Sequence, residues 1–444
     1  MTTDTQPMSP PRSMLLAYAL PGLPLAALTL PLYIYLPAFY AEDLGLGFAL
    51  VGALLLVARL WDMVTDPVVG ALSDRLDTPW GRRRPWLIAG TPLVMVSLWF
   101  LFDPPTDVSG TYLLIWTMAL YLAATFVRLP YEAWGAELSP DYDGRSRVTG
   151  HREAFVVLGT LLATGIPALT ATTKAEALHS LAWLMLLSLP VAVGLACRLV
   201  PDPPARRRTP VPWRDGLRIL AANAPFRRLI LAYFLNGVAN GLPATLFLLF
   251  VERVLVQPSW AGPLLFVYFV CGLAAVPVWL RLSYRYGKHR IWALAMVGTS
   301  VVFATVPLLG PGDQLWFAAI CVLTGIGLGA DLVLPPAMQA DVVDLDRLES
   351  GAQRTGLYFA LWGVATKLAL ALAVGLAFPA LELAGFQPRT AAPDSTSGLL
   401  ALALLYGLVP VGFKLISIAL MWGFPITRTR QAEIRRLIAQ QARS

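Results

Sequence analysis

Charged residues are scarce in this chain. Only 14% of its 444 residues are Asp, Glu, Lys or Arg, whereas 57% are hydrophobic. That balance excludes an ordinary soluble domain, in which about a quarter of the residues are charged. Repeated apolar runs that are long enough to cross a bilayer indicate instead a polytopic membrane protein.

Cysteine and histidine are also scarce, with three residues of each type. The cysteines all lie in apolar runs, and their spacing offers neither a disulfide framework nor a metal site, so we expect buried thiols. The histidines are not clustered either, and we expect no cofactor and no metal other than a coupling cation. The polar first 13 residues lack the basic-then-apolar order of a cleaved signal peptide, so the first apolar run is expected to remain as a helix.

Twelve hydrophobic segments form two sets of six, separated by a stretch rich in proline and arginine. Arginine is concentrated in alternate loops, and the positive-inside rule places those loops and both termini in the cytoplasm. The predicted fold is therefore an all-α polytopic membrane protein with twelve transmembrane helices in two six-helix bundles. We expect cytoplasmic tails over 1–13 and 425–444, bundles over 14–200 and 226–424, and a cytoplasmic linker over 201–225.

The second apolar run carries three charged residues, Arg59, Asp62 and Asp66. Their spacing of i, i+3 and i+7 places all three on one stripe of a helix. A charge at the centre of a bilayer costs at least about 2.5 kcal/mol on insertion scales, so the stripe must face protein or a watery cavity. It is interpreted as a functional site, and the alternative is a salt-bridge cluster that locks helices together.

A basic, turn-forming loop follows this stripe, and part of it is repeated later in the chain. The segment WGRRRPW at 80–86 is echoed by RYGKHRIW at 285–292. Corresponding loops in two halves suggest the repeat architecture of secondary transporters. We expect the first loop to form a cytoplasmic gate; its candidate residues are Gly70, Asp74, Arg75, Gly81, Arg82 and Arg83.

Three motifs in register carry a family resemblance. They are RLWDMVTDPVVGALSDR followed by WGRRRPW, LPYEAWGAELSPDYDGRSRVTGHREAF, and ADVVDLDRLESGAQRTGLYFALWGVATKLA. With them the sequence resembles the major facilitator superfamily, and within it the glycoside–pentoside–hexuronide:cation symporters. That group contains melibiose permease-like proteins and is related to the sodium–lysophospholipid symporters. The resemblance covers most of the chain and implies the major facilitator fold.

The same resemblance implies a cation site formed by Asp62 and Asp66, with Thr125 on the fourth helix assisting them. Thr65 lies between the two acids and is a further oxygen donor, since a hard cation takes several oxygen ligands. Lys367 on the eleventh helix is implied beside this site, and we expect it and Arg59 to compensate the acids when the cation leaves. We expect the coupling cation to be Na⁺ rather than H⁺.

The sequence departs from the family pattern where a sugar would bind. The first helix has no acid, Arg128 replaces an acid, and Glu132 replaces an aromatic residue, whereas Arg152 is kept. We expect these three residues and Asp331 to form a substrate pocket, with Arg128 and Asp331 facing one central cavity. The alternative is that Arg128 and Glu132 form only an i, i+4 structural pair.

The predicted function is cation-coupled symport of a polar organic solute, a glycoside or sugar-like molecule, by alternating access. The alternative substrate is a lysophospholipid-like amphiphile, which the apolar first helix favours. An intramembrane aspartyl protease is disfavoured, because its two acids must come from different helices to share a proton. We expect a monomer in the plasma (inner) membrane that contacts lipid, a monovalent cation and a small-molecule substrate, but no nucleic acid.

Overall fold

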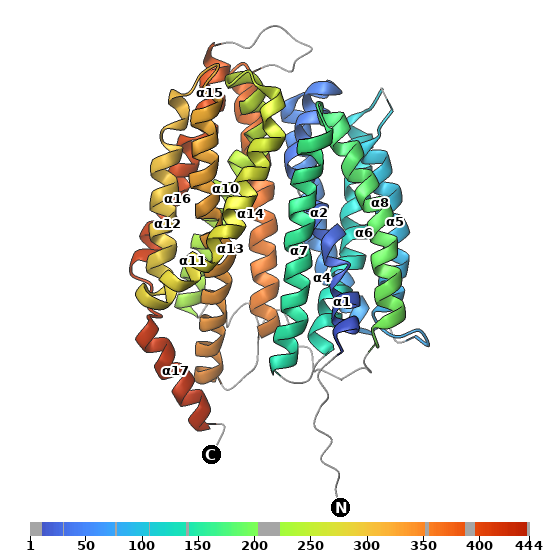
Figure 1. Ribbon diagram of the computed structural model, residues 1–444, viewed down its shortest axis with the longest axis vertical. Helices are drawn as coiled ribbons and strands as arrows, with labels where there is room; N and C mark the ends of the chain where they lie inside the picture. The colour runs from blue at the N-terminus through green and yellow to red at the C-terminus, as the bar shows by residue number, and fades with distance from the viewer. Residues whose placement is uncertain are drawn as a thin grey trace, which may run out of the picture. The chain divides into compact units, whose positions relative to one another are not determined.

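The computed structural model describes residues 11–29, 31–75, 78–105, 107–138, 142–202, 223–350, 355–386 and 396–441. The described residues contain helices and no β-strand, and twelve of the helical spans are long and apolar enough to cross a membrane (Figure 1). The expected all-α membrane fold with twelve spans is confirmed. The chain divides into two compact units, Met1–Arg207 and Arg208–Ser444. Most of the expected linker, residues 203–222, lies outside the described part.

The first span of the first unit is not one regular helix. It is built from α1 (Arg12–Ala19), α2 (Gly22–Ala27), the π-helical turn η1 (Pro31–Tyr35), α3 (Leu36–Ala38) and the π-helical turn η2 (Phe39–Asp43). Four prolines in this stretch explain the interruptions, because proline has no backbone N–H to donate and its ring clashes with the preceding turn. Neighbouring helices bury most of the span, so the freed carbonyls are shielded from lipid.

The remaining spans of the first unit are continuous helices. They are α4 (Phe48–Arg75), α5 (Arg84–Phe102), α6 (Gly110–Glu137), α7 (Tyr142–Thr170) and α8 (Lys174–Leu199). Packing of α4 and α5 against α6 places the charged stripe of α4 beside the middle of α6. That contact between α4 and α6 positions the candidate site described below.

The second unit contains the other six spans and one further helix. Its helices are α10 (Ala224–Leu249), continued by the π-helical turn η3 (Phe250–Val254), the 3₁₀ turn η4 (Pro258–Trp260), α11 (Ala261–Tyr286), α12 (Lys288–Phe303), the 3₁₀ turn η5 (Val306–Leu308), α13 (Gln314–Ser350), α14 (Thr355–Leu383), α15 (Thr396–Tyr406), α16 (Leu408–Trp422) and α17 (Arg428–Gln441). The short break between α15 and α16 divides the last span. α17 packs against the end of α13, where the side-chain amide of Gln431 donates to Asp344 Oδ2 at 3.0 Å.

Glycine permits a close helix contact in this unit, between α11 and α13. A Cβ atom on Gly325 would lie 2.4 Å from the carbonyl oxygen of Tyr268, and one on Gly329 would lie 2.5 Å from the carbonyl oxygen of Gly272. No side chain fits at those distances. Small residues let helix backbones approach in this way where lipid provides no hydrophobic driving force between helices.

Candidate functional site

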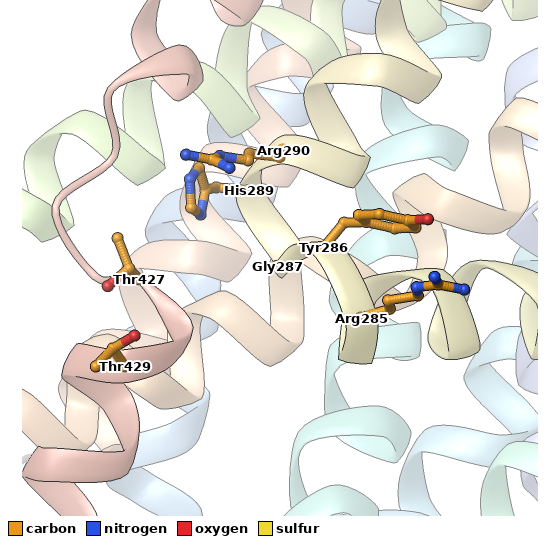
Figure 2. A pocket seen from close by; sticks show the side chains of 7 residues that line it. All are labelled: Arg285, Tyr286, Gly287, His289, Arg290, Thr427 and Thr429. Carbon is orange, nitrogen blue, oxygen red and sulfur yellow. The ribbon is translucent and has the colours of Figure 1, made fainter.

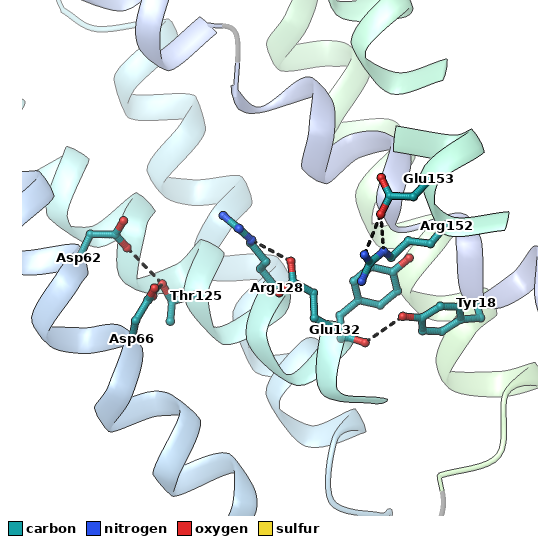
Figure 3. Close-up of polar contacts among 9 residues, drawn as sticks. Tyr18, Asp62, Asp66, Thr125, Arg128, Glu132, Arg152 and Glu153 are labelled. Carbon is teal, nitrogen blue, oxygen red and sulfur yellow. Dashed lines mark hydrogen bonds and ion pairs between the residues drawn. The ribbon is translucent and has the colours of Figure 1, made fainter. Parts of the chain in front are cut away.

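Two carboxylates of α4 meet one hydroxyl of α6. Thr125 Oγ1 lies 2.8 Å from Asp66 Oδ1 and 3.3 Å from Asp62 Oδ1 (Figure 3). Asp62 and Thr125 are buried, and Asp66 is partly buried. The hydroxyl carries a single hydrogen, so it can donate to only one of the two carboxylates at a time. The result is an oxygen-rich cluster within a membrane span, which suits a hard monovalent cation.

Arg59 is the third charged residue of the stripe on α4, and it contacts both Asp62 and two aromatic rings. Its guanidinium carbon lies 4.4 Å from the centre of the Tyr33 ring and 4.0 Å from that of the Tyr121 ring, and its Nη1 lies 3.4 Å from Asp62 Oδ2. A desolvated cation between aromatic rings gains about 2 kcal/mol. The buried arginine is therefore held by two rings and one carboxylate. The two tyrosines were not foreseen from the sequence, because the ring contacts depend on how the first span and α6 pack against α4.

Thr65 has a different role from Thr125. Its hydroxyl donates to the backbone carbonyl of Asp62 at 3.1 Å, which is a bond within its own helix. Such a bond to the carbonyl of a preceding turn is common for threonine inside helices. Because it uses the hydroxyl hydrogen, Thr65 could contribute to a cation site only through the lone pairs of its oxygen. Lys367 lies on α14 in the second unit and is partly buried. Its expected place beside the acid pair remains a prediction.

Arg128 and Glu132 form an ion pair on α6. Arg128 Nε donates to Glu132 Oε1 at 3.0 Å, and the two side chains are 56% and 42% exposed (Figure 3). This is the i, i+4 pair given above as the alternative. An exposed ion pair inside a membrane span does not face lipid, because the cost of a charge in hydrocarbon is high. The expected place of this pair in a substrate pocket stays a prediction.

Arg152 lies on α7 and bonds to its neighbour in the sequence. Its Nη2 and Nε donate to Glu153 Oε1 at 2.7 and 3.2 Å. Nearby, the Tyr18 hydroxyl donates to the backbone carbonyl of Tyr131 at 3.2 Å, and the two tyrosine rings stack with centroids 4.8 Å apart (Figure 3). The first span is thereby fastened to α6 close to the Arg128 pair.

Asp331 belongs to a buried polar network in the second unit. Its two carboxylate oxygens accept from Trp292 Nε1 at 2.6 Å and from Asn240 Nδ2 at 2.7 Å. Lys414 Nζ lies 4.0 Å from the same carboxylate and donates to Asn236 Oδ1 and Asn240 Oδ1 at 2.8 and 2.7 Å. Lys414 is only 1% exposed and Asp331 15% exposed. The Asn240 amide thus bridges a buried lysine and a partly buried aspartate.

This network was missed at the sequence level. Lys414 is the one charged residue between positions 396 and 427. A charge inside a membrane span is costly, so the reasoning that identified the charged residues of α4 also applies to Lys414. Asp331 and Arg128 each have a charged partner in their own unit. The expectation that both face one cavity stays a prediction.

The candidate gate ties the end of α4 to the loop that follows it and to the end of α8. Arg83 is almost fully buried; its Nη1 donates to Ser73 Oγ at 3.0 Å, and its backbone N–H donates to Asp202 Oδ2 at 2.9 Å. Arg84 Nη2 donates to the carbonyl of Val200 at 2.7 Å. Asp202 follows α8 and was not foreseen as part of the gate.

Gly81 is required at its position in the gate. Its φ of +104° lies in the region that favours glycine, and a Cβ atom there would lie 2.0 Å from Asp202 Oδ2. Arg82 is buried, and Gly70 lies within α4. The side chains of Asp74 and Arg75 lie outside the described part of the structure, so their expected roles stay predictions.

Two six-span units with buried charges inside them are typical of a membrane transporter. The chain matches, over residues 17–428, the family described as MFS/sugar transport protein. It belongs to this family, and the predicted major facilitator membership is confirmed.

Curated relatives match almost the whole chain. The human sodium-dependent lysophosphatidylcholine symporter 1 is 25% identical, over 95% of this chain and 87% of its own length. An uncharacterized symporter of Synechocystis sp. is 25% identical, over 91% and 92%. The sphingosine-1-phosphate transporter MFSD2B of Xenopus tropicalis is 26% identical, over 89% and 85%.

Solved structures share the fold at low sequence identity. A variant of the nucleoside transporter NupG superposes with a TM-score of 0.71 at 12% identity, covering 93% of this chain and 99% of its own. The D-xylose–proton symporter superposes with a TM-score of 0.69 at 14% identity, covering 94% and 98%. At these identities the likeness concerns the fold alone.

Proposed function

We propose that the protein is a sodium-coupled symporter and that Asp62, Asp66 and Thr125 form its cation site. The observation that carries the proposal is the approach of two carboxylates, one helical turn apart, to a single hydroxyl at 2.8 and 3.3 Å. Oxygen ligands on adjacent turns suit Na⁺, and several relatives are named as sodium-dependent symporters. In this proposal Arg59 holds Asp62 in place and does not itself contact the cation.

Charge balance gives the cation a role in the transport cycle. The stripe carries two carboxylates and one guanidinium, so it is negative without a cation and neutral with one. A neutral site is less costly to enclose in a low-dielectric interior than a charged site. Cation binding would thus favour the state in which the site is closed to water. By linkage, a substrate that also favours this state raises the affinity for the cation by the same factor.

For the substrate, an amphiphile with an anionic or zwitterionic head group has the stronger support. The first span contributes no acid to the interior between residues 11 and 41, and Arg128 presents an exposed guanidinium inside a membrane span. A guanidinium offers a planar donor fork that matches the oxygens of a phosphate group. Lysophosphatidylcholine and sphingosine-1-phosphate, after which two of the relatives are named, both contain a phosphate group.

A sugar is the second candidate. The description of the family includes sugar transport, and the exposed Arg128–Glu132 pair combines donors and acceptors suited to hydroxyl groups. Arg152 and Asp331 would contribute to either substrate pocket. The two candidate substrates differ in their route to the pocket, since only the amphiphile would enter it from the bilayer.

Uptake into proteoliposomes tests both parts of the proposal. With pH fixed, an inward sodium gradient should drive accumulation of radiolabelled lysophosphatidylcholine or, for the second candidate, of melibiose. Asp62→Asn and Asp66→Asn should abolish sodium-driven uptake, whereas Glu176→Gln, which removes an exposed acid of α8, should not. Sodium-driven uptake by both Asn variants at the wild-type rate would refute the proposed site. Uptake driven by a proton gradient alone would refute sodium coupling.

A further inference from the structure

The second unit contains a pocket of about 290 Å³, and none of the described residues that line it carries a carboxylate. It lies where α11 turns into α12 and where the chain passes from α16 into α17 (Figure 2). The lining includes Arg285, His289 and Arg290 on one side and the hydroxyl-bearing Thr427 and Thr429 on the other. Basic groups and hydroxyls without an acid are a donor set for an anion.

Two helices begin at this pocket. α12 begins at Lys288 after Gly287, and α17 begins at Arg428 after Thr427. The Thr427 hydroxyl accepts from the backbone N–H of Arg430 at 3.4 Å, as expected of a residue that caps a helix start. Each helix start presents backbone N–H groups and a partial positive charge, and both add to the attraction for an anion.

His289 provides an independent sign of a ligand. It is only 6% exposed, it lines the pocket beside Arg290, and among the described residues its ring makes no hydrogen bond (Figure 2). Most of the side chain is packed away, but its ring nitrogens are open to the pocket, so an imidazole N–H can donate to a ligand there. Lys288 is turned elsewhere, because its ammonium contacts Asp341 Oδ2 at 2.6 Å.

Exposed aromatic residues place the pocket at the level of the membrane surface. Tyr286 borders the pocket and is 52% exposed, and Trp422 at the end of α16 is 71% exposed. Tyrosine and tryptophan gather where hydrocarbon meets water. The arginine-rich loops predict that this is the cytoplasmic surface, where basic pockets between helices bind anionic lipid head groups.

We infer that this pocket binds a phosphate group, with Arg290, His289 and Thr429 as its side-chain donors. The phosphate belongs to the head group of an anionic phospholipid or to a soluble phosphate compound. Binding there would link α11 and α12 to α17 and so hold the C-terminal helix against its own bundle. The inference does not depend on the substrate or on the cation of the proposed transport function.

Native mass spectrometry and thermal unfolding of the full-length protein in detergent test the inference. The lipid probe is phosphatidylglycerol, compared with phosphatidylcholine, and the soluble probe is inorganic phosphate, compared with chloride at equal ionic strength. Loss of a hydrogen bond to a charged group should weaken binding at least about tenfold in Arg290→Gln. The matched control is Arg281→Gln, which removes an exposed arginine of α11 outside the pocket.

Selective retention of phosphatidylglycerol by the wild type and Arg281→Gln, but not by Arg290→Gln, supports a lipid head group. Stabilisation by inorganic phosphate with the same dependence on Arg290 supports a soluble phosphate compound. Equal binding of both probes by the wild type and Arg290→Gln, or no binding by the wild type, overturns the inference. If Arg290→Gln does not fold, Thr429→Ala replaces it, since that change removes only an exposed hydroxyl, and unchanged binding then overturns the inference.

Discussion

Substitutions at the pair of buried Lys414 and partly buried Asp331 should destabilise the second unit unequally. Removing one partner of a buried ion pair costs about 3–5 kcal/mol, because the other charge loses its compensation. Asp331→Asn leaves an ammonium that is 1% exposed and whose remaining partners, among the described residues, are two amide oxygens. Lys414→Met leaves a carboxylate that keeps its bonds from Trp292 and Asn240 and is 15% exposed. We therefore expect Asp331→Asn near the upper end of the range and Lys414→Met near its lower end.

The double variant Lys414→Met with Asp331→Asn should recover much of this loss. Both charges are then gone, and close charge pairs show coupling energies of about 2 kcal/mol or more. The free energy of unfolding in mixed detergent micelles is the quantity to measure. Arg430→Met is the matched control; both members of its pair with Glu433 are about half exposed, so it should cost only about 1 kcal/mol.

A second double-mutant cycle tests whether Asp331 is coupled to Arg128, as the sequence suggested, or only to Lys414. Arg128 has Glu132 as its partner, so Arg128→Gln combined with Asp331→Asn should be additive within about 0.5 kcal/mol. Additivity for Lys414 with Asp331, or strong coupling of Arg128 with Asp331, would refute the reasoning from the buried network.

Three further predictions concern the first unit. Thr125→Val should lower sodium affinity in uptake assays about tenfold, since it removes a hydroxyl shared by two carboxylates, whereas Thr125→Ser should retain it. Tyr121→Leu should cost about 2 kcal/mol in unfolding free energy by removing one of the rings that hold Arg59, and Tyr121→Phe should cost less because it keeps the ring. Gly81→Ala should cost about 1–3 kcal/mol and increase cysteine labelling at the end of α4, because its Cβ would displace Asp202; normal stability and labelling would contradict this role for Gly81.

The sequence by itself determined the class of fold and the stripe of charges. A bilayer offers the backbone no hydrogen-bond partners, so apolar runs of sufficient length must be helices, and their number and spacing can be counted. The bilayer also makes each charge in its interior costly, so Arg59, Asp62 and Asp66 can be recognised as unusual from the sequence alone. Lys414 carries the same signal and could have been found in that way.

Only the tertiary structure decided which side chains meet. Thr125 is 63 residues from Asp62 in the chain, and Lys414 is 174 residues from Asn240. These contacts depend on the rotation and crossing of each helix, which close packing sets and which no local pattern records. The same holds for the phosphate pocket, since the starts of α12 and α17 lie more than a hundred residues apart in the chain and come together only when α16 packs beside α12.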